Sequence, residues 1–368
     1  MFKDKVKGRL GFGCMRMQMI DNEVDKNEFN RMIDMFIKAG FNYFDTAHGY
    51  IEGKSETAIC DCLSARYNRE DFVLANKLSY WYIEKEEDIV PLFENQLKLC
   101  GVEYFDFYLF HSMHREAYKK HKSCNSFEVI KKLKEQGKIK HIGMSFHDTA
   151  DFLDLVLTEQ PSIEVVQLQL NYLDYDDPTV QSKACYDVAV KHGKKVIVME
   201  PVRGGRLVNL PEEAAKVLEK LGNGSQASHA LRYVATYPKV FMVLSGMGNT
   251  EMMEDNINTF KNFVPIEEKD LEIFDEVRGI IRKLNQISCT KCNYCKEVCP
   301  SDIPISEIFN IYNDLLGGKQ SKDDTKEHLS LYREKITSCV KCGKCEKNCP
   351  QNIKIRENLE NIEKIFWS

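Results

Sequence analysis

The sequence predicts an α/β protein in which a (β/α)8 TIM barrel over residues 1–284 precedes a small, mainly α-helical domain over residues 285–368. Three observations favour this architecture. The chain has 368 residues, more than one hydrophobic core ordinarily organises. Short strand-like runs alternate with longer amphipathic stretches up to about residue 264. Eight of the 14 cysteines then lie between Cys289 and Cys349.

Eight short runs rich in β-branched or aromatic residues are the expected strands of the barrel. They comprise residues 10–13, 41–44, 72–75, 105–110, 139–143, 165–168, 196–199 and 240–244. Between them lie stretches with apolar residues at helical spacing. This alternation indicates parallel strands joined by right-handed crossovers, and eight such units in about 265 residues fit a closed barrel. A doubly wound open sheet is the alternative, but no Gly-x-Gly-x-x-Gly follows an early strand.

Composition limits the environment and the partners of the protein. Hydrophobic residues make up 43% of the chain and charged residues 29%, which is the balance of a globular protein. The formal net charge is −5 and the basic residues are scattered, so we expect no nucleic-acid partner. The N-terminal residues lack the apolar core of a signal peptide, and no run is long enough to span a bilayer. These features predict a cytoplasmic protein without membrane association, in which cysteines serve metal binding rather than disulfides.

Two copies of one cysteine motif occupy the C-terminal domain, and the second repeats the first after 50 positions. Each copy places two, two and three residues between successive cysteines and ends in Cys-Pro. The motifs comprise Cys289, Cys292, Cys295 and Cys299, and then Cys339, Cys342, Cys345 and Cys349. Three thiolates at this spacing suit one [4Fe–4S] cluster, and the fourth, before proline, ligates the other cluster.

This motif resembles that of the dicluster ferredoxin family, and the helical spacing of residues 305–316 and 325–335 makes the domain similar to α-helical ferredoxins. We therefore predict a ferredoxin-like domain with two [4Fe–4S] clusters that exchange ligands between the motifs. One cluster has the ligands Cys289, Cys292, Cys295 and Cys349, and the other has Cys339, Cys342, Cys345 and Cys299. Structural zinc is the alternative, although zinc sites with four cysteine ligands ordinarily use two separated pairs.

Polar residues follow three successive strands of the expected barrel, at the face where such barrels carry out chemistry. Asp45 and Tyr50 follow the second strand, Lys77 the third and His111 the fourth. Tyr50 can protonate a carbonyl oxygen if its pKa, about 10 when unperturbed, is lowered. The Lys77 ammonium would lower it by favouring the phenolate, and Asp45 would hold Lys77 charged. His111 would donate a hydrogen bond to the same oxygen, so these four are the expected catalytic residues.

The order and spacing of the four residues resemble the tetrad of the aldo-keto reductase family, over roughly residues 8–264. The resemblance implies direct hydride transfer between nicotinamide C4 and a carbonyl carbon, with no metal and with Tyr50 as general acid. The cofactor implied is NADP(H) or NAD(H), and the substrate is a small carbonyl compound or alcohol.

The following strand ends supply candidate contacts to this cofactor. Ser145 and Gln167 match the family's carboxamide-binding residues, although Phe146 replaces the asparagine that usually follows the serine. Met199 stands where the family ordinarily has an aromatic residue that stacks on the nicotinamide. The resemblance therefore implies a nicotinamide site with an altered stacking position.

Candidate contacts to the rest of the cofactor come from the last two loops. Arg203 could bind phosphate next to Gly204, which allows close backbone approach. Ser245 and Asn249 lie in the loop before the last helix of the barrel. Met252 replaces the arginine that the family uses for the 2′-phosphate, so we expect weak discrimination between NADH and NADPH.

One constraint separates the functional hypotheses. Nicotinamide moves two electrons as hydride whereas each cluster moves one, so direct exchange requires a flavin or a radical step. A flavin could place its phosphate in the loops after the last two strands. The first hypothesis is a carbonyl reductase whose clusters pass electrons to or from the site or a redox partner protein. The alternatives are an electron-transfer module whose barrel binds flavin or a partner, and a reductase with purely structural clusters.

Overall fold

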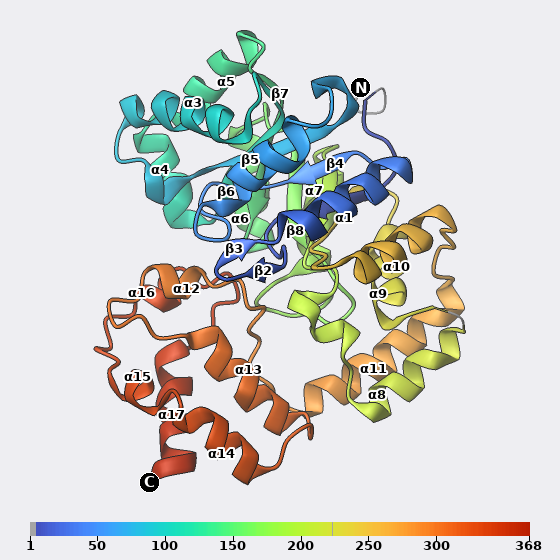
Figure 1. Cartoon of the computed structure of the whole chain (residues 1–368), viewed down its shortest axis with the longest axis vertical. Coiled ribbons are helices and arrows are strands. Elements are labelled where there is room, and N and C mark those ends of the chain that lie inside the picture. The colour runs from blue at the N-terminus through green and yellow to red at the C-terminus, as the bar shows by residue number, and fades with distance from the viewer. Residues whose placement is uncertain (1–4, 223) are drawn as a thin grey trace. The chain divides into compact units, whose positions relative to one another are not determined.

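Eight parallel strands close into a barrel in the computed structural model, which describes residues 5–222 and 224–368 (Figure 1). Neighbouring strands pair in chain order, and β10 pairs with β1 to close the sheet. The strands are β1 (Leu10–Gly13), β4 (Tyr43–Asp45), β5 (Val73–Ser79), β6 (Phe105–Met113), β7 (Ile139–Phe146), β8 (Val165–Gln169), β9 (Lys195–Met199) and β10 (Val240–Ser245). Each overlaps one of the eight predicted runs, so the closed barrel is confirmed and the open sheet is wrong.

Apolar side chains from the strands fill the barrel interior. They are Tyr43, Val73, Ala75, Phe107, Leu109, Val165, Ile197, Met242 and Leu244, which we call the interior core. Val73 and Ala75 illustrate the pattern, because residues two apart on a strand point to the same side. Six of the eight strands, β4, β5, β6, β8, β9 and β10, contribute residues to the interior core.

Amphipathic helices surround this barrel, and α1 (Lys26–Lys38) shows how the sequence forms them. Asp25 caps the helix by accepting hydrogen bonds from the amides of Asn27 and Glu28. Phe29, Met32, Ile33 and Phe36 form its buried face. The other helices of unit 1 are α2 (Lys54–Ile59), α3 (Ile89–Cys100), α4 (Arg115–Ser123), α5 (Ser126–Glu135), α6 (Ala150–Glu159), α7 (Ser182–Lys191), α9 (Gln226–Ala235) and α10 (Thr250–Lys261), of which α10 follows the last strand. A short hairpin of β2 (Met19–Ile20) and β3 (Glu23–Val24) precedes α1. No helix in residues 5–222 and 224–368 combines the length and the hydropathy needed to cross a bilayer.

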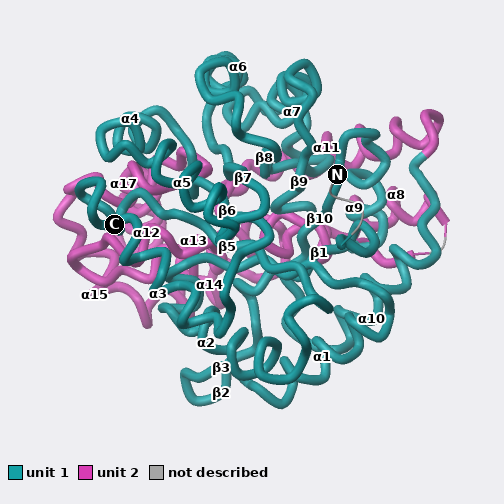
Figure 2. Tube along the Cα trace, turned by 90° about the horizontal axis from the view of Figure 1, so that it is seen from above, with its two compact units in different colours: residues 1–201, 227–266 teal, residues 202–226, 267–368 magenta. Residues whose placement is uncertain are grey.

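The chain forms two compact units, and each unit consists of two separate segments of the chain (Figure 2). Unit 1 comprises residues 1–201 and 227–266, and unit 2 comprises residues 202–226 and 267–368. Unit 2 therefore includes α8 (Glu212–Leu218) and α11 (Leu271–Lys283), which pack against each other. The compact units are not the same as the two predicted domains, and the predicted domain boundary after residue 284 stays a prediction.

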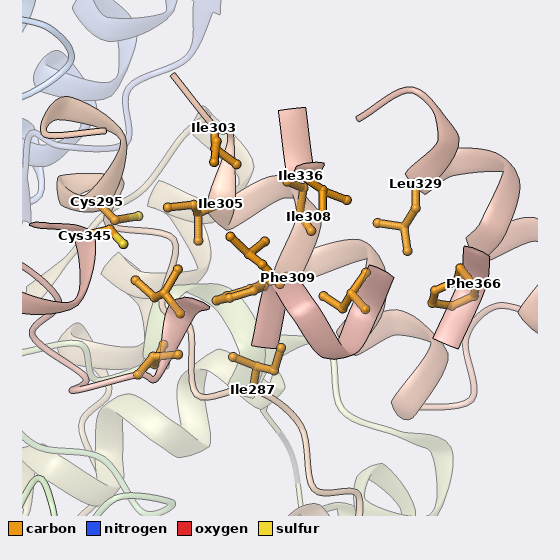
Figure 3. Close-up of a cluster of buried hydrophobic side chains, with 14 residues drawn as sticks. Ile287, Cys295, Ile303, Ile305, Ile308, Phe309, Leu329, Ile336, Cys345 and Phe366 are labelled. Carbon is orange, nitrogen blue, oxygen red and sulfur yellow. The ribbon is translucent and has the colours of Figure 1, made fainter. Parts of the chain in front are cut away.

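The C-terminal part of unit 2 is helical, as predicted, and has its own core (Figure 3). Its helices are α12 (Tyr294–Glu297), α13 (Ile305–Leu316), α14 (Lys322–Ser330), α15 (Arg333–Thr337), α16 (Lys344–Lys347) and α17 (Ile355–Trp367). Ile308, Phe309 and Ile362 are buried at the centre of this core. Cys295 and Cys345 belong to the same core and lie next to each other in Figure 3.

The two cysteine motifs also repeat in backbone conformation. Lys291 and Lys341, fifty positions apart, have φ angles of 57° each, and Asn293 and Gly343 have φ angles of 64° and 74°. Left-handed residues at matching positions produce the same tight turns in both motifs. A four-residue helix follows each turn, α12 in the first motif and α16 in the second. The sequence repeat is therefore a structural repeat.

Candidate functional site

The predicted catalytic residues lie together at the carboxyl ends of neighbouring strands. Asp45 ends β4, Lys77 lies in β5, His111 lies in β6, and Tyr50 is in the loop after β4. Asp45, Lys77 and His111 each come two positions after a residue of the interior core, so their side chains point inward above it. The exposed fraction is 0% for Lys77 and at most 9% for the other three side chains. The four residues thus form one buried group.

Lys77 connects this group. Its Nζ donates to Asp45 Oδ1 at 2.7 Å, to the carbonyl oxygen of Thr46 at 2.8 Å and to Tyr50 Oη at 3.3 Å. Only a protonated amine has three hydrogens for three acceptors, so this geometry requires the ammonium form. The ammonium lies beside the Tyr50 oxygen, where it stabilises the negative charge that forms when the phenol gives up its proton.

Burial and charge act in opposite directions on the Asp45–Lys77 pair. Burial alone would lower the pKa of Lys77, but the charges of Asp45 and Tyr50 outweigh it and leave this pKa above its ordinary value. Burial raises the pKa of Asp45, and the Lys77 charge opposes that rise. Because the three hydrogen bonds of Nζ require an ammonium, the pair is ionised at neutral pH.

His111 is held as a neutral imidazole. Burial, with the Lys77 charge as the next largest cause, lowers the pKa of His111 well below its ordinary value. Its Nδ1 lies 2.6 Å from Ser79 Oγ, and Ser79 is paired with His111 in the register of β5 and β6. When the Ser79 hydroxyl donates to Nδ1, Nε2 carries the hydrogen and can donate to a substrate oxygen. The ring centroid lies 5.0 Å from that of Trp81 and 5.9 Å from that of Tyr50.

Two residues that support the site were missed in the sequence. Ser79 has a detectable signal, because it lies two positions after Lys77 and therefore shares its side of the strand. Glu56 has none, because a glutamate in a short amphipathic helix is usually solvent-exposed. In the structure Glu56 is fully buried and accepts from Asn76 Nδ2 at 2.8 Å, while its other oxygen lies 2.6 Å from His48 Nδ1. Glu56 thereby links the loop that contains Tyr50 to β5.

Ser145 and Gln167, the candidate carboxamide-binding residues, lie side by side. They are register partners of β7 and β8, and both are at most 3% exposed. Ser145 Oγ accepts from the amide of Ser112 at 2.8 Å. Gln167 Oε1 is buried without a hydrogen-bond partner among the described residues. A buried acceptor without a partner is costly, so an amide donor such as the nicotinamide carboxamide fits this position.

The remaining candidates from the barrel have local roles in the structure. Met199 ends β9. Ser245 ends β10, where its Oγ accepts from Asn256 Nδ2 at 2.8 Å. Asn249 caps α10 by accepting from the amide of Met252 at 2.9 Å, and Met252 is 50% exposed. Ser245 and Asn249 therefore order the loop before α10, and their contacts to a cofactor stay predictions.

Arg203 and Gly204 belong to unit 2 rather than unit 1. Gly204 has a φ of 62°, and a Cβ at this position would lie 2.2 Å from the carbonyl oxygen of Thr290. The glycine is therefore required by its close approach to the first cysteine motif. Arg203 is 5% exposed. Their predicted role in binding phosphate stays a prediction.

The second cluster site is a cavity that combines the two motifs. Its lining includes Cys339, Cys342 and Cys345 of the second motif together with Cys299 of the first. Burial raises the pKa of the Cys345 thiol to about 11, and the neighbouring charges include those of Cys299 and Cys339. Cys299 therefore lines the same cavity as three cysteines of the second motif, and its role as a ligand of the second cluster stays a prediction. A cavity with four thiols around it suits a [4Fe–4S] cluster, which would hold them as thiolates.

Cys295 of the first motif lies near cysteines of both motifs. Burial raises the pKa of Cys295, and the charges of Cys292, Cys289 and Cys349 add to this effect. The charge of Cys345 acts in the same direction, so two cysteines of the second motif lie near Cys295, and the assignment of Cys349 to the first cluster stays a prediction. The amide of Lys291 donates to Cys289 Sγ at 3.4 Å, a contact that stabilises a thiolate ligand.

The spacing of the thiols also bears on the zinc alternative. Within residues 5–222 and 224–368, no three His, Cys, Asp or Glu side chains are grouped closely enough to hold a single metal ion. The sulfur ligands of one zinc ion converge on a single point, whereas those of a [4Fe–4S] cluster surround a larger cubane. Metal analysis of the purified protein distinguishes the two.

Comparisons with known proteins match both parts of the chain. Residues 9–278 match the Aldo/keto reductase family, and residues 285–353 match the 4Fe-4S dicluster domain. The uncharacterized oxidoreductase YqkF of Bacillus subtilis is 23% identical over 279 residues, which cover 67% of this chain and 85% of that protein.

Solved structures show the same fold. The holo form of an aldo-keto reductase from Bacillus halodurans is 22% identical, with a TM-score of 0.62 over 73% of this chain and 91% of that one. An aldo/keto reductase from Klebsiella pneumoniae, in complex with NADP and acetate, is 19% identical, with a TM-score of 0.60 over the same shares. With its closed barrel and its helical C-terminal region, the chain belongs to the aldo/keto reductase family of oxidoreductases and carries a 4Fe-4S dicluster domain.

Proposed function

We propose that the barrel catalyses nicotinamide-dependent reduction of a small carbonyl compound, or oxidation of the corresponding alcohol. The observation that carries this proposal is the set of three hydrogen bonds from Lys77 to Asp45, Thr46 and Tyr50. It places a fixed positive charge against a phenol at the mouth of a barrel, next to a neutral histidine. Support for the cofactor comes from the unpartnered Gln167 Oε1 and from the relative that binds NADP.

The residues of the chain would control the proton in this reaction. Bound NAD(P)H supplies a hydride to the carbonyl carbon. Tyr50 donates its proton to the carbonyl oxygen as that oxygen becomes an alkoxide, and Lys77 stabilises the phenolate left behind. His111 donates a hydrogen bond to the same oxygen and orients the carbonyl. Tyr50 then recovers a proton from solvent.

We further propose that the C-terminal domain holds two [4Fe–4S] clusters that transfer single electrons. The cavity lined by Cys299, Cys339, Cys342 and Cys345 supports this assignment. Because hydride transfer moves an electron pair, the clusters would exchange electrons with a protein partner, and a flavin would be needed for exchange with nicotinamide. The absorption spectrum of protein purified without air tests whether flavin accompanies the iron–sulfur bands.

The experiment for the barrel compares two tyrosine variants of the full chain. Tyr50→Phe removes the proposed general acid and should lower aldehyde reduction about 10²–10⁴-fold, with little change in nicotinamide affinity. Tyr43→Phe is the matched control, because Tyr43 is buried in the interior core and its hydroxyl has no partner in the described part of the chain. Turnover with NADH and NADPH is followed by cofactor absorbance, and affinity by fluorescence titration. Equal turnover in both variants would refute the role of Tyr50.

A further inference from the structure

The two cluster sites are related by the repeat but differ in their access to solvent. Thr290 follows the first cysteine of motif one and is 2% exposed, whereas its counterpart Val340 is 64% exposed. Cys342 is an exposed ligand, whereas its counterpart Cys292 is partly covered. Since the backbone turns match, the surroundings of the motifs and not their conformation produce this difference.

A segment of unit 2 covers the first site. Gly204 packs against the carbonyl of Thr290, and Arg206 donates to the carbonyl oxygen of Ile287 at 2.5 Å and to the side chain of Gln286. Residues 337–340 are the counterparts of residues 287–290 in the second motif. Among the described residues, their hydrogen bonds are those within α15 and one from Ser301 Oγ to the carbonyl oxygen of Ser338, and no segment comparable to residues 204–206 bonds to them. Among the described residues, the second site therefore lacks a cover like the one that residues 204–206 give the first site.

Charge distinguishes the sites in the same direction. Residues 333–356, which include the second motif, contain seven basic and two acidic side chains, a formal charge of +5 for the segment alone. Lys335, Lys341 and Lys354 pair with Asp302, Glu360 and Glu357, which lie outside the segment, so the charge that remains without such a partner is smaller and includes Lys344 and Lys347. The corresponding segment 283–306 has a formal charge of +1. Lys344 and Lys347 are exposed, and neither has an ion-pair partner among the described residues. Their counterparts in the first motif are Tyr294 and Glu297, so the repeat itself does not require these lysines.

We propose that the surface around the second cluster site is the docking site of a small acidic one-electron carrier protein of the ferredoxin or flavodoxin class. This inference rests on the proposed electron transfer by the clusters. The exposed Val340 supplies an apolar contact beside the ligands, and Lys344 and Lys347 supply the charges that attract an acidic partner. The carrier's reduced centre loses one electron and the second cluster gains it, without making or breaking a bond.

The test measures binding of two probes to the anaerobically purified full chain with its clusters. The probes are an acidic two-cluster ferredoxin and an acidic flavodoxin, and basic cytochrome c serves as the control carrier. We expect at least one acidic probe to bind at low ionic strength and to lose about tenfold in affinity as salt shortens the Debye length. The two acidic probes distinguish an iron–sulfur carrier from a flavin carrier.

Charge-reversal variants test the surface itself. Lys344→Glu combined with Lys347→Glu should weaken binding of the acidic probe by about tenfold or more, chiefly through slower association. Lys322→Glu combined with Lys326→Glu changes the net charge equally on α14, which lies away from α16 in Figure 1, and should weaken binding less than about twofold. If Lys344→Glu combined with Lys347→Glu lowers the iron content, Lys344→Gln combined with Lys347→Gln is measured in its place, with the same expected direction.

The outcomes separate this proposal from the proposed catalysis. A Tyr50→Phe protein that loses carbonyl reduction but binds the carrier unchanged supports docking independently of the barrel. Failure of both acidic probes to bind, equal binding of cytochrome c, or equal effects of the two charge-reversal pairs would overturn the docking site. Wild-type protein that binds the carrier but does not reduce carbonyl compounds would count against the proposed reductase function and not against the docking site.

Discussion

Removing Lys77 should destabilise the barrel strongly, because it isolates a buried carboxylate. In Lys77→Met, Asp45 Oδ1 loses its 2.7 Å partner, and Oδ2 already has none within the described chain. Charges at this distance attract by about 6 kcal/mol at an effective dielectric constant of ~20. Desolvation offsets part of that attraction, and breaking a buried pair from one side typically costs ~3–5 kcal/mol. We expect this loss in the free energy of unfolding at neutral pH.

The loss should depend on pH in a defined direction. Burial raises the pKa of Asp45, and without Lys77 nothing opposes that rise. A carboxyl whose folded pKa is raised binds its proton more readily in the folded state, so stability falls as pH rises through the window above its ordinary value. Lys77→Met should therefore be least destabilised near pH 4 and most destabilised near neutrality.

A double-mutant cycle with Asp45→Asn supplies the control. The double variant leaves no charge buried at this site. Its loss in the free energy of unfolding should be at most half of the loss measured for either single variant. The chain has two tryptophans, so a Trp367→Phe background leaves Trp81 to report urea unfolding of the barrel by fluorescence. Single variants that each cost less than ~1 kcal/mol, or a double variant that costs their sum, would refute the ion-pair reasoning.

Two further predictions concern the metal sites and the surface of the barrel. Anaerobically purified protein should contain about eight iron and eight sulfide per chain. Cys299→Ser should disturb the cluster of the second motif and leave most of the first cluster intact, which electron paramagnetic resonance can resolve. Damage confined to the first cluster would refute the ligand exchange, and four iron or zinc would refute the dicluster assignment. Glu164 has a pKa lowered to about 2, because hydrogen bonds from His141, Lys134 and the Ile142 amide outweigh the opposing effect of burial. The ionised Glu164 side chain therefore stabilises the fold fully above its ordinary pKa, and this stabilisation disappears as pH falls through about 2. Glu164→Gln should lower the free energy of unfolding by about 1 kcal/mol at neutral pH and by almost nothing near pH 2. A loss that does not change with pH would argue against the lowered pKa.

Local pattern explains why the barrel and its catalytic group could be predicted. Strand runs and helical spacing are local, and inward parity along a strand places Asp45, Lys77 and His111 without any tertiary information. The roles of Glu56 and Gly204 could not be predicted in this way. Glu56 is buried by the fold around Asn76 and His48, and Gly204 meets Thr290, which lies 86 positions later. Contacts between segments far apart in the chain leave no periodic signal in the sequence.

Residues 202–226 lie between two strands of the barrel in the chain but belong to unit 2, so the two units cannot be separated by a single cut. The chain passes between the compact units after residues 201, 226 and 266, so the connection between β9 and β10 contributes to the iron–sulfur unit. α8, which packs on α11, and Arg206, which bonds to Ile287, both come from this connection. A chain that ends at residue 266 would keep α8 without α11, and residues 267–368 expressed alone would lack both α8 and Arg206. The two units are therefore interleaved along the chain, and neither can be cut out as one continuous segment.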